Sequence, residues 1–437
     1  MAAALARSAL PVCVVFACLS LFLVPEPLRL PAVGLTGIGV FGFVLLMSAG
    51  ALRLFELTMY LAALTMAWNG LRLTDWMTVS DVFLLAAFML APLALPLRFS
   101  RSSPLNAVLF GVGLIIAGGL LGAAVGGQTD ISPLLRLSAA SVGLLILFAL
   151  WQPPREKLEI IVWLWVGSAA VSAMYDIGKD FGLMGSSGRS GGIATGFKDG
   201  VNSYVRAVGP AIAFCWYKRP IGLLAGSILA LFIIASIMSG SRIALVALFV
   251  MAGLFLLTPK RVILLSGMGI AGLVLIGIFS YTTLFSERNA ISRFLLSLDS
   301  QDQRVSSNEQ RLILLQRGLT AVEARPFTGT GFREDRDAYQ RQSTCPSIVC
   351  EGKPYHIIYL QIWAAAGLLG VLGIGLIVVV VLKEFLIVDK SDLLRVGLIA
   401  ATISVLVTGL FTPVIWERWI WFTLALALSA QPLRQRD

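Results

Sequence analysis

Residues 362–382 read I-W-A-A-A-G-L-L-G-V-L-G-I-G-L-I-V-V-V-V-L and contain no charged side chain. A helix needs roughly 20 apolar residues to cross about 30 Å of hydrocarbon, so this run is long enough to span a membrane. Roughly 14 such runs meet this criterion along the chain. Arg53, Glu56 and Asn69 interrupt the run near residue 61, and merged or re-entrant segments would leave about 12 or 13 spans. The candidate runs are centred near residues 16, 41, 61, 87, 115, 142, 167, 208, 229, 249, 271, 370, 403 and 422.

The composition indicates the same class of protein. Hydrophobic residues make up 57% of the chain, charged residues make up 13%, and the mean hydropathy is +0.87. Soluble domains carry about 25% charged residues. The predicted fold class is therefore an all-α polytopic membrane protein with about 12–14 transmembrane helices.

The net charge of +10 has a topological explanation. Basic residues cluster in alternate short connections, which is typical of cytoplasmic loops and predicts that both termini are cytoplasmic. A nucleic-acid partner is therefore not expected. Residues 8–24 lack a clear small-residue cleavage pattern and are interpreted as a retained first span rather than a secretory signal. The clustered residues are Arg53, Arg98, Arg101, Arg155, Lys157, Lys218, Arg219, Lys260, Arg261, Lys383, Lys390, Arg434 and Arg436.

Two longer polar stretches fall on the opposite, outer face. The first, residues 178–200, is rich in glycine and serine, so its backbone can turn sharply or approach a ligand closely. The second, residues 282–354, has ten basic residues, of which nine are arginine; guanidinium groups form bidentate bonds to phosphate. We therefore expect transmembrane helices over 1–281, including the 178–200 loop, a large periplasmic loop over 282–354, and C-terminal transmembrane helices over 355–437.

Residues 309–325 within the larger loop predict an amphipathic helix. Leu312, Leu315, Leu319 and Val322 recur at helical spacing. The helix should stop at Pro326, where T-G-T-G follows as a turn. Such a helix is expected to pack on the membrane domain.

Five cysteines do not form a disulfide framework. Cys13, Cys18 and Cys215 fall in predicted spans, where they would pack as small apolar groups. Cys345 and Cys350 lie in the outer loop, in C-P-S-I-V-C, and could close a disulfide ring in an oxidising compartment. Two free thiols are the alternative.

His356 is the only histidine in the chain. Pro354 and Tyr355 precede an apolar helix, so His356 is expected in its first turn, where unpaired amides oppose protonation of the imidazole. A neutral histidine can act as a general base. The alternative is an interfacial histidine that hydrogen-bonds the loop.

Arginines supply the second half of the candidate site. Arg189 lies in the 178–200 loop, Arg242 follows S-G-S at an outer helix boundary, and Arg311 lies on the loop helix. Together they would suit a lipid diphosphate, whose anionic leaving group needs stabilisation. The alternatives are a snorkelling role for Arg242 and water-facing positions for Arg311 and for Arg317 on the same helix. Arg206, near the start of a span, is a further candidate anion contact because a charge there is costly unless paired.

Tyr359, Glu417 and Arg418 are interpreted from their positions in predicted spans. Tyr359, one helical turn beyond His356, could line the same substrate site as His356; the alternative is that its ring packs in the protein interior. Glu417 and Arg418, in W-E-R-W, are expected to be interfacial anchors with the flanking tryptophans.

Four motifs in this order resemble the O-antigen ligase and Wzy-type polymerase superfamily. They are G-R-S-G-G-I-A-T-G-F-K-D-G-V-N, containing Arg189 and Asn202; S-G-S-R-I-A-L, containing Arg242; the Arg311 helix with its P-F-T-G-T-G-F turn; and His356 followed by Gly367 and Gly370. Ile357 replaces the polar residue that usually follows the histidine in this family. The resemblance covers about 180–385, roughly half the chain, and implies a GT-C-like helical fold.

The predicted activity is glycan transfer from undecaprenyl diphosphate to an acceptor hydroxyl at the periplasmic face. His356 would deprotonate the hydroxyl and arginines would bind the diphosphate, in a single inverting displacement. No P-loop, HExxH or Cys/His metal spacing occurs in the sequence, so no cofactor and no metal are expected. We favour an O-antigen ligase, whose acceptor is lipid A-core, over a polymerase, whose acceptor is a second lipid-linked glycan.

Two alternatives come from other classes. A transporter of lipid-linked oligosaccharide would place polar groups near the bilayer midplane and show paired interrupted helices. A purely structural membrane protein would give no reason for an arginine-dominated loop.

Overall fold

A computed structural model of the chain describes residues 50–67, 78–96, 104–180, 223–238, 242–256, 305–332, 357–411, 415 and 417–430. Within these ranges the chain is helical and contains no β-strand. The α-helices are α3 (Ala51–Thr65), α4 (Val79–Ala94), α5 (Pro104–Gly126), α6 (Ser132–Ser138), α7 (Leu144–Trp151), α8 (Arg155–Asp180), α10 (Leu223–Met238), α11 (Arg242–Leu256), α14 (Val305–Ala324), α16 (Ile358–Ile387), α17 (Leu393–Thr408) and α18 (Arg418–Ser429). A π-helical turn, Ala139–Gly143, joins α6 to α7, and a 3₁₀ turn, Gly409–Phe411, extends α17.

Five of the described segments are long and apolar enough to cross a membrane, and three shorter apolar helices accompany them. This confirms the predicted polytopic all-α class, although the total of 12–14 spans includes segments outside the described ranges. The five segments are Pro104–Gly126, Ser132–Trp151, Arg155–Met174, Ile358–Ile387 and Leu393–Phe411.

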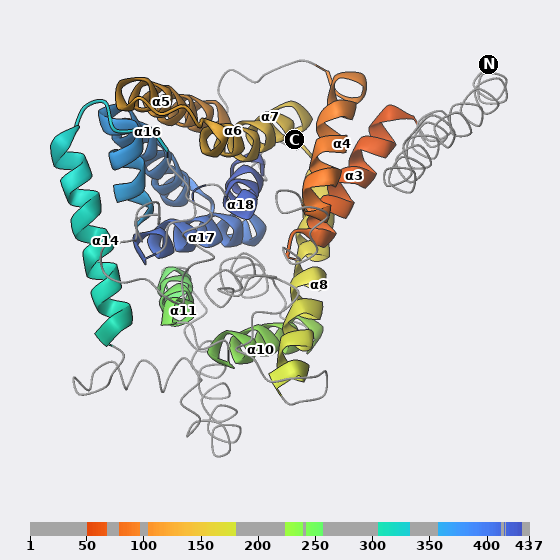
Figure 1. Cartoon of the computed structure of the whole chain (residues 1–437). Coiled ribbons are helices and arrows are strands. Elements are labelled where there is room, and N and C mark those ends of the chain that lie inside the picture. The colour runs from red at the N-terminus through yellow and green to blue at the C-terminus, as the bar shows by residue number, and fades with distance from the viewer. Residues whose placement is uncertain are drawn as a thin grey trace, which may run out of the picture.

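The most extensive helix pair joins α5 to α16, which lie against each other in Figure 1. Glycines on α5 make this close approach possible, since small residues let two helix backbones meet. A Cβ atom added at Gly111 would lie 2.8 Å from the carbonyl oxygen of Gly373, and one added at Gly118 would overlap that of Ala366. The sequence alone had not singled out this glycine face of α5.

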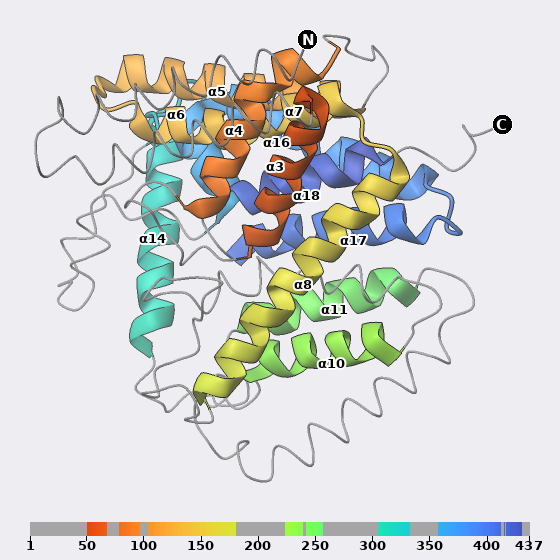
Figure 2. The same ribbon diagram turned by 90° about the vertical axis from the view of Figure 1, so that its right-hand side faces the viewer.

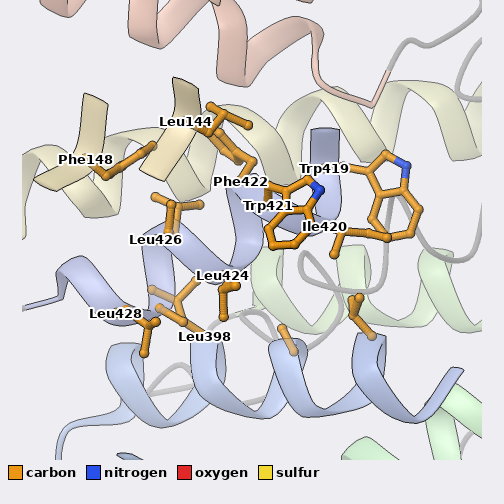
Figure 3. Close-up of a cluster of buried hydrophobic side chains, with 14 of the residues drawn as sticks. Leu144, Phe148, Leu398, Trp419, Ile420, Trp421, Phe422, Leu424, Leu426 and Leu428 are labelled. Carbon is orange, nitrogen blue, oxygen red and sulfur yellow. The ribbon is translucent and has the colours of Figure 1, made fainter. Parts of the chain in front are cut away.

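Helix α18 forms the centre of the hydrophobic core. Its residues from Trp419 to Ser429 are all buried, as expected for a helix that is apolar on every side. Phe422 makes edge contacts with Trp165 of α8, at a centroid distance of 5.2 Å, and with Phe148 of α7, at 5.6 Å. Figure 3 shows this cluster, with Leu398 of α17 on its other side.

Ion pairs join helices that are distant in sequence. Arg155, at the start of α8, contacts Asp392 in the α16–α17 connection at 2.8 Å. Lys157 pairs with Glu56 of α3 near the same end of α8. The start of α8 is therefore tied by ion pairs both to the α16–α17 connection and to α3.

Arg418, which was expected to be an interfacial anchor, has a carboxylate partner on another helix. Its Nη1 lies 2.8 Å from both carboxylate oxygens of Asp81, in the first turn of α4, and its side chain is mostly buried. Asp81 also completes the capping box of α4 with Thr78. The ion pair of Arg418 with Asp81 therefore joins the N-terminus of α18 to the N-terminus of α4.

Candidate functional site

Helix α14 packs against the first turns of α16. It ends at Ala324, before Pro326, as predicted; Leu315 and Val322 of the predicted apolar face contact the cluster with α16, but Leu319 does not. Leu314, Gly318 and Val322 are buried, whereas Leu319 is largely exposed. The contact forms a small apolar cluster, which we call the α14–α16 cluster: Leu315, Ala321, Val322, Ile357, Leu360 and Ala364.

Helix α14 also has a distinct direction in the molecule. Figure 2 shows α14 upright at one side, while α5, α10, α11 and α17 run across the view. A helix placed in this way lies transverse to several of the apolar helices, in keeping with a loop helix that packs on the membrane domain.

Helix α16 is broken at Gly367, where the backbone adopts φ 59° and ψ −148°. A break in a helix leaves amides and carbonyls without their usual partners, and these groups are costly when buried. The segment P-F-T-G-T-G-F, residues 326–332, supplies the partners, and we call it the 326–332 turn. The hydrogen bonds run from Leu368 N to Phe327 O (3.0 Å), from Thr330 N to Ala364 O (2.9 Å) and from Gly331 N to Ala365 O (2.9 Å).

The glycines of the turn are required by this pairing. Gly329 and Gly331 have φ of 71° and 84°, a region that side chains with a Cβ atom rarely adopt. A Cβ atom at Gly329 would also overlap the carbonyl of Ala365. The G-x-G spacing therefore serves backbone pairing with α16.

The opposite side of the turn is fixed to the end of α5. Arg325 Nη1 donates to the carbonyl oxygen of Val125 at 2.8 Å, and Gln128 Nε2 donates to that of Phe332. The Phe332 ring is buried against Gly119. The 326–332 turn thus links α14, α5 and the two parts of α16 into one unit.

Residues 227–375 match the family model described as O-antigen ligase. The chain carries a domain of the O-antigen ligase/Wzy superfamily. No curated protein matches the chain. The matched O-antigen ligase domain covers about a third of the sequence, begins within α10 and ends in α16 just beyond the break. It therefore contains α14, the 326–332 turn and Gly367, which the geometry joins.

The O-antigen ligase domain also includes His356, which lies outside the described residues. Helix α16 begins at Ile358 with Ile357 as its N-cap, and the expectation that His356 lies in the first helical turn concerns a residue outside the described part. The apolar Ile357 gives the helix no side-chain cap. Because no side chain caps them, the first-turn amides of α16 direct a partial positive charge toward the residues that precede the helix.

Two predicted arginines fall on described helices of the domain. Arg311 lies in α14, and Arg242 is the first residue of α11; the side chains of both lie outside the described part. Since the 326–332 turn pairs with residues 364–368 and Leu315 joins the cluster with Ile357, α14 runs alongside the start of α16. Arg311 lies one helical turn before Leu315 on α14. Its backbone is therefore near the N-terminal end of α16, which follows directly after Ile357.

Five other predicted residues fall outside the part of the chain that the structure describes. Arg189, Asn202, Arg206, Cys345 and Cys350 lie outside the described residues. Within the described ranges, no group of three histidine, cysteine, aspartate or glutamate side chains could hold a metal ion.

Tyr359 connects α16 to α17. Its hydroxyl donates to the carbonyl oxygen of Leu406 at 2.7 Å, and its ring packs against the main core. This contact joins the O-antigen ligase domain to α17, which lies beyond residue 375, and agrees with the packing alternative for Tyr359.

Gln361 is a residue that the sequence reasoning missed. Only 4% of it is exposed, and its Oε1 atom has no hydrogen-bond partner in the described part of the chain. Side chains on a helix lean toward its N-terminus, so the Gln361 amide leans toward the start of α16. Its signal in the sequence was a single amide within an otherwise apolar stretch.

Proposed function

We propose that this protein transfers a glycan from undecaprenyl diphosphate to a hydroxyl group of lipid A-core, at the periplasmic face of the inner membrane. The observation that carries the proposal is the O-antigen ligase domain at residues 227–375. This segment contains Arg242, Arg311 and His356, and within it α14 packs against the start of α16.

The proposed reaction is a single displacement at the anomeric carbon. His356 takes the proton of the acceptor hydroxyl as its oxygen attacks, and the bond from the anomeric carbon to the diphosphate oxygen breaks. Undecaprenyl diphosphate leaves with the bonding electrons, and the configuration inverts. Neutral imidazole is the form that accepts the proton, and the uncapped start of α16 favours that form.

Arginines stabilise the leaving group in this mechanism. Arg189, Arg242 and Arg311 bind the diphosphate through bidentate hydrogen bonds, with Arg206 as a further contact. Asn202 and Tyr359 line the substrate site. No step requires a metal ion, because guanidinium groups neutralise the charge that develops on the diphosphate.

We propose the arrangement inferred from the sequence as the setting for this reaction. Transmembrane helices occupy 1–281 and 355–437 in a GT-C-like fold, and the 282–354 segment is the large periplasmic loop. Both termini are cytoplasmic, and a Cys345–Cys350 disulfide would form in the oxidising periplasm.

Replacing His356 with alanine tests the proposal. The protein, reconstituted in lipid nanodiscs, is given an undecaprenyl diphosphate-linked glycan and lipid A-core, and product and released undecaprenyl diphosphate are measured. We expect His356→Ala to lower the transfer rate roughly 10²–10⁴-fold, because general-base catalysis contributes that much. Gln316→Ala, on the exposed side of α14, is the matched control and should retain the wild-type rate.

A wild-type rate in His356→Ala would remove the general-base role. A second acceptor, another undecaprenyl diphosphate-linked repeat unit, separates ligase from polymerase. Transfer to that unit and none to lipid A-core would replace the proposed ligase with a Wzy-type polymerase that uses the same donor chemistry.

A further inference from the structure

The break in α16 coincides with a cluster of exposed aromatic side chains. Phe327, in the 326–332 turn, is 71% exposed, and Trp363, on the first part of α16, is 40% exposed. The Trp363 Nε1 atom donates to the carbonyl oxygen of Pro326 at 3.2 Å, so the two aromatic residues lie on neighbouring backbone segments. We call Pro326, Phe327 and Trp363 the aromatic corner.

The aromatic corner continues an apolar stripe on the second part of α16. Large exposed hydrophobic residues follow the break at helical spacing, and Leu368 joins directly to the backbone of Phe327. In a helix of membrane-spanning length, such a stripe faces acyl chains. The stripe consists of Leu368, Leu372, Val379, Leu382 and Leu386. Phe327 and Trp363 lie at the end of the stripe that begins with Leu368.

The surroundings of the corner change from apolar to polar within one helical turn. Arg325, next to Pro326, donates to Val125 and forms no ion pair with any carboxylate of the described residues. Thr320 and Glu323, on the last turns of α14, are exposed. One side of the corner therefore carries the Arg325 guanidinium and the polar face of α14. The other side carries the two aromatic rings and the leucine stripe. This arrangement matches the change in polarity at a bilayer surface.

We infer that the aromatic corner is seated in the phospholipid bilayer at the boundary between headgroups and acyl chains, with Arg325 at the level of the lipid phosphates. Phe327 and the edge of Trp363 enter the acyl region, to a depth of roughly 5–10 Å as for interfacial helices. The lipid thereby holds the 326–332 turn against the break in α16. This inference does not depend on the proposed transferase activity.

Depth-dependent quenching tests the inference. A single cysteine labelled with an environment-sensitive fluorophore is introduced at Phe327, in a chain whose five native cysteines are replaced by alanine. Nanodiscs contain phospholipids with a nitroxide at the headgroup, near the carbonyl or deep in the chain. Matched controls carry the label at Leu372, which is 53% exposed on the apolar stripe, and at Glu323, on the polar face of α14.

We expect the label at residue 327 to be quenched most strongly by the nitroxide near the carbonyl, and severalfold more than the label at residue 323. The Leu372→Cys label should respond most to the deep nitroxide. Trp363→Cys gives a second labelling position, so that failure of one variant to fold does not decide the result. Quenching of the Phe327→Cys label by an aqueous quencher, to the level seen at residue 323, would overturn the inference.

A donor-binding role would give a different result. If added undecaprenyl diphosphate abolished lipid quenching at residue 327, the aromatic corner would be a site for the donor's polyprenyl chain, and the inference of bulk-lipid contact would be wrong. Unchanged quenching with the donor present supports the bilayer contact.

Discussion

The carbonyl oxygen of Phe327 accepts a hydrogen bond from the backbone amide of Leu368 at 3.0 Å. In an unbroken helix that amide would donate to the carbonyl of Ala364, which instead accepts from Thr330. A loop turn has therefore replaced intrahelical partners at the break in α16. The position of the first part of α16, which follows His356, depends on this exchange.

Gly367 should be the most sensitive glycine of α16. A Cβ atom there would overlap the Phe327 carbonyl in a backbone conformation that disfavours side chains, so Gly367→Ala should cost more than about 2 kcal/mol of stability. Thermal unfolding in detergent measures the effect. Gly375→Ala is the matched control, because its Cβ would meet nothing within 4 Å, and it should change stability by less than about 1 kcal/mol. Equal unfolding temperatures for the two variants would contradict this account.

Alanine substitutions on α5 should also differ in their effect on stability, according to whether the glycine faces α16. Gly118→Ala forces a methyl group into the carbonyl of Ala366, and overpacking of this kind costs about 1–3 kcal/mol. Gly113→Ala, five residues earlier on the same helix, adds its methyl group to open space. Unfolding measurements should separate the two variants. A tolerated Gly118→Ala would mean that α5 and α16 can move apart at little cost.

Arg311 should require a guanidinium group rather than a positive charge alone. Arg311→Lys keeps the charge but loses bidentate geometry, so we expect the KM for the lipid-linked donor to rise roughly tenfold or more. Arg317→Lys, on the same helix, is the control and should leave the KM near the wild-type value. An unchanged KM in Arg311→Lys would exclude this residue from diphosphate binding.

Gln361 should show opposite effects on stability and activity. Its buried Oε1 lacks a partner in the described part of the chain, and Gln361→Met removes that desolvation cost, which should raise stability by about 1 kcal/mol. We expect glycan transfer to fall, because an unpaired amide near the start of α16 is suited to a substrate hydroxyl. A more stable variant with full activity would show that the amide has no role with the substrate.

The Asp81–Arg418 ion pair should contribute to stability through direct coupling. The Arg418 side chain is mostly buried and that of Asp81 is 29% exposed, so the coupling energy should be about 1–2 kcal/mol, between the values for exposed and buried pairs. A double-mutant cycle with Asp81→Asn and Arg418→Met measures this energy from unfolding curves. Additive single effects would show that the contact contributes little.

The sequence predicted those features that depend on local pattern. Apolar length identified the spans that the described residues contain, and Pro326 marked the end of α14. The family was recognised from motif order, and the match at residues 227–375 confirms it. These signals lie within short segments, so they needed no knowledge of tertiary contacts.

Features that depend on distant contacts were missed. Gly367 falls within an apolar run, and nothing local indicates that the 326–332 turn would replace its helical hydrogen bonds. Leu319 matched the helical spacing, yet it is exposed, whereas Leu315 and Val322 contact the cluster with α16. The partner of Arg418, Asp81, lies 337 residues earlier in the sequence, so no local pattern indicated the ion pair. The roles of His356 and the predicted arginines stay predictions, because they concern side chains beyond the described part.

The separation of 337 residues between Asp81 and Arg418 has a consequence for biosynthesis. During translation, α4 emerges from the ribosome long before α18 is synthesised, so for that time the carboxylate of Asp81 lacks its cation. Release of a chain shortened before residue 418 would leave that acid permanently uncompensated. Quality-control proteases that recognise exposed polar groups within the bilayer should therefore remove such truncated products.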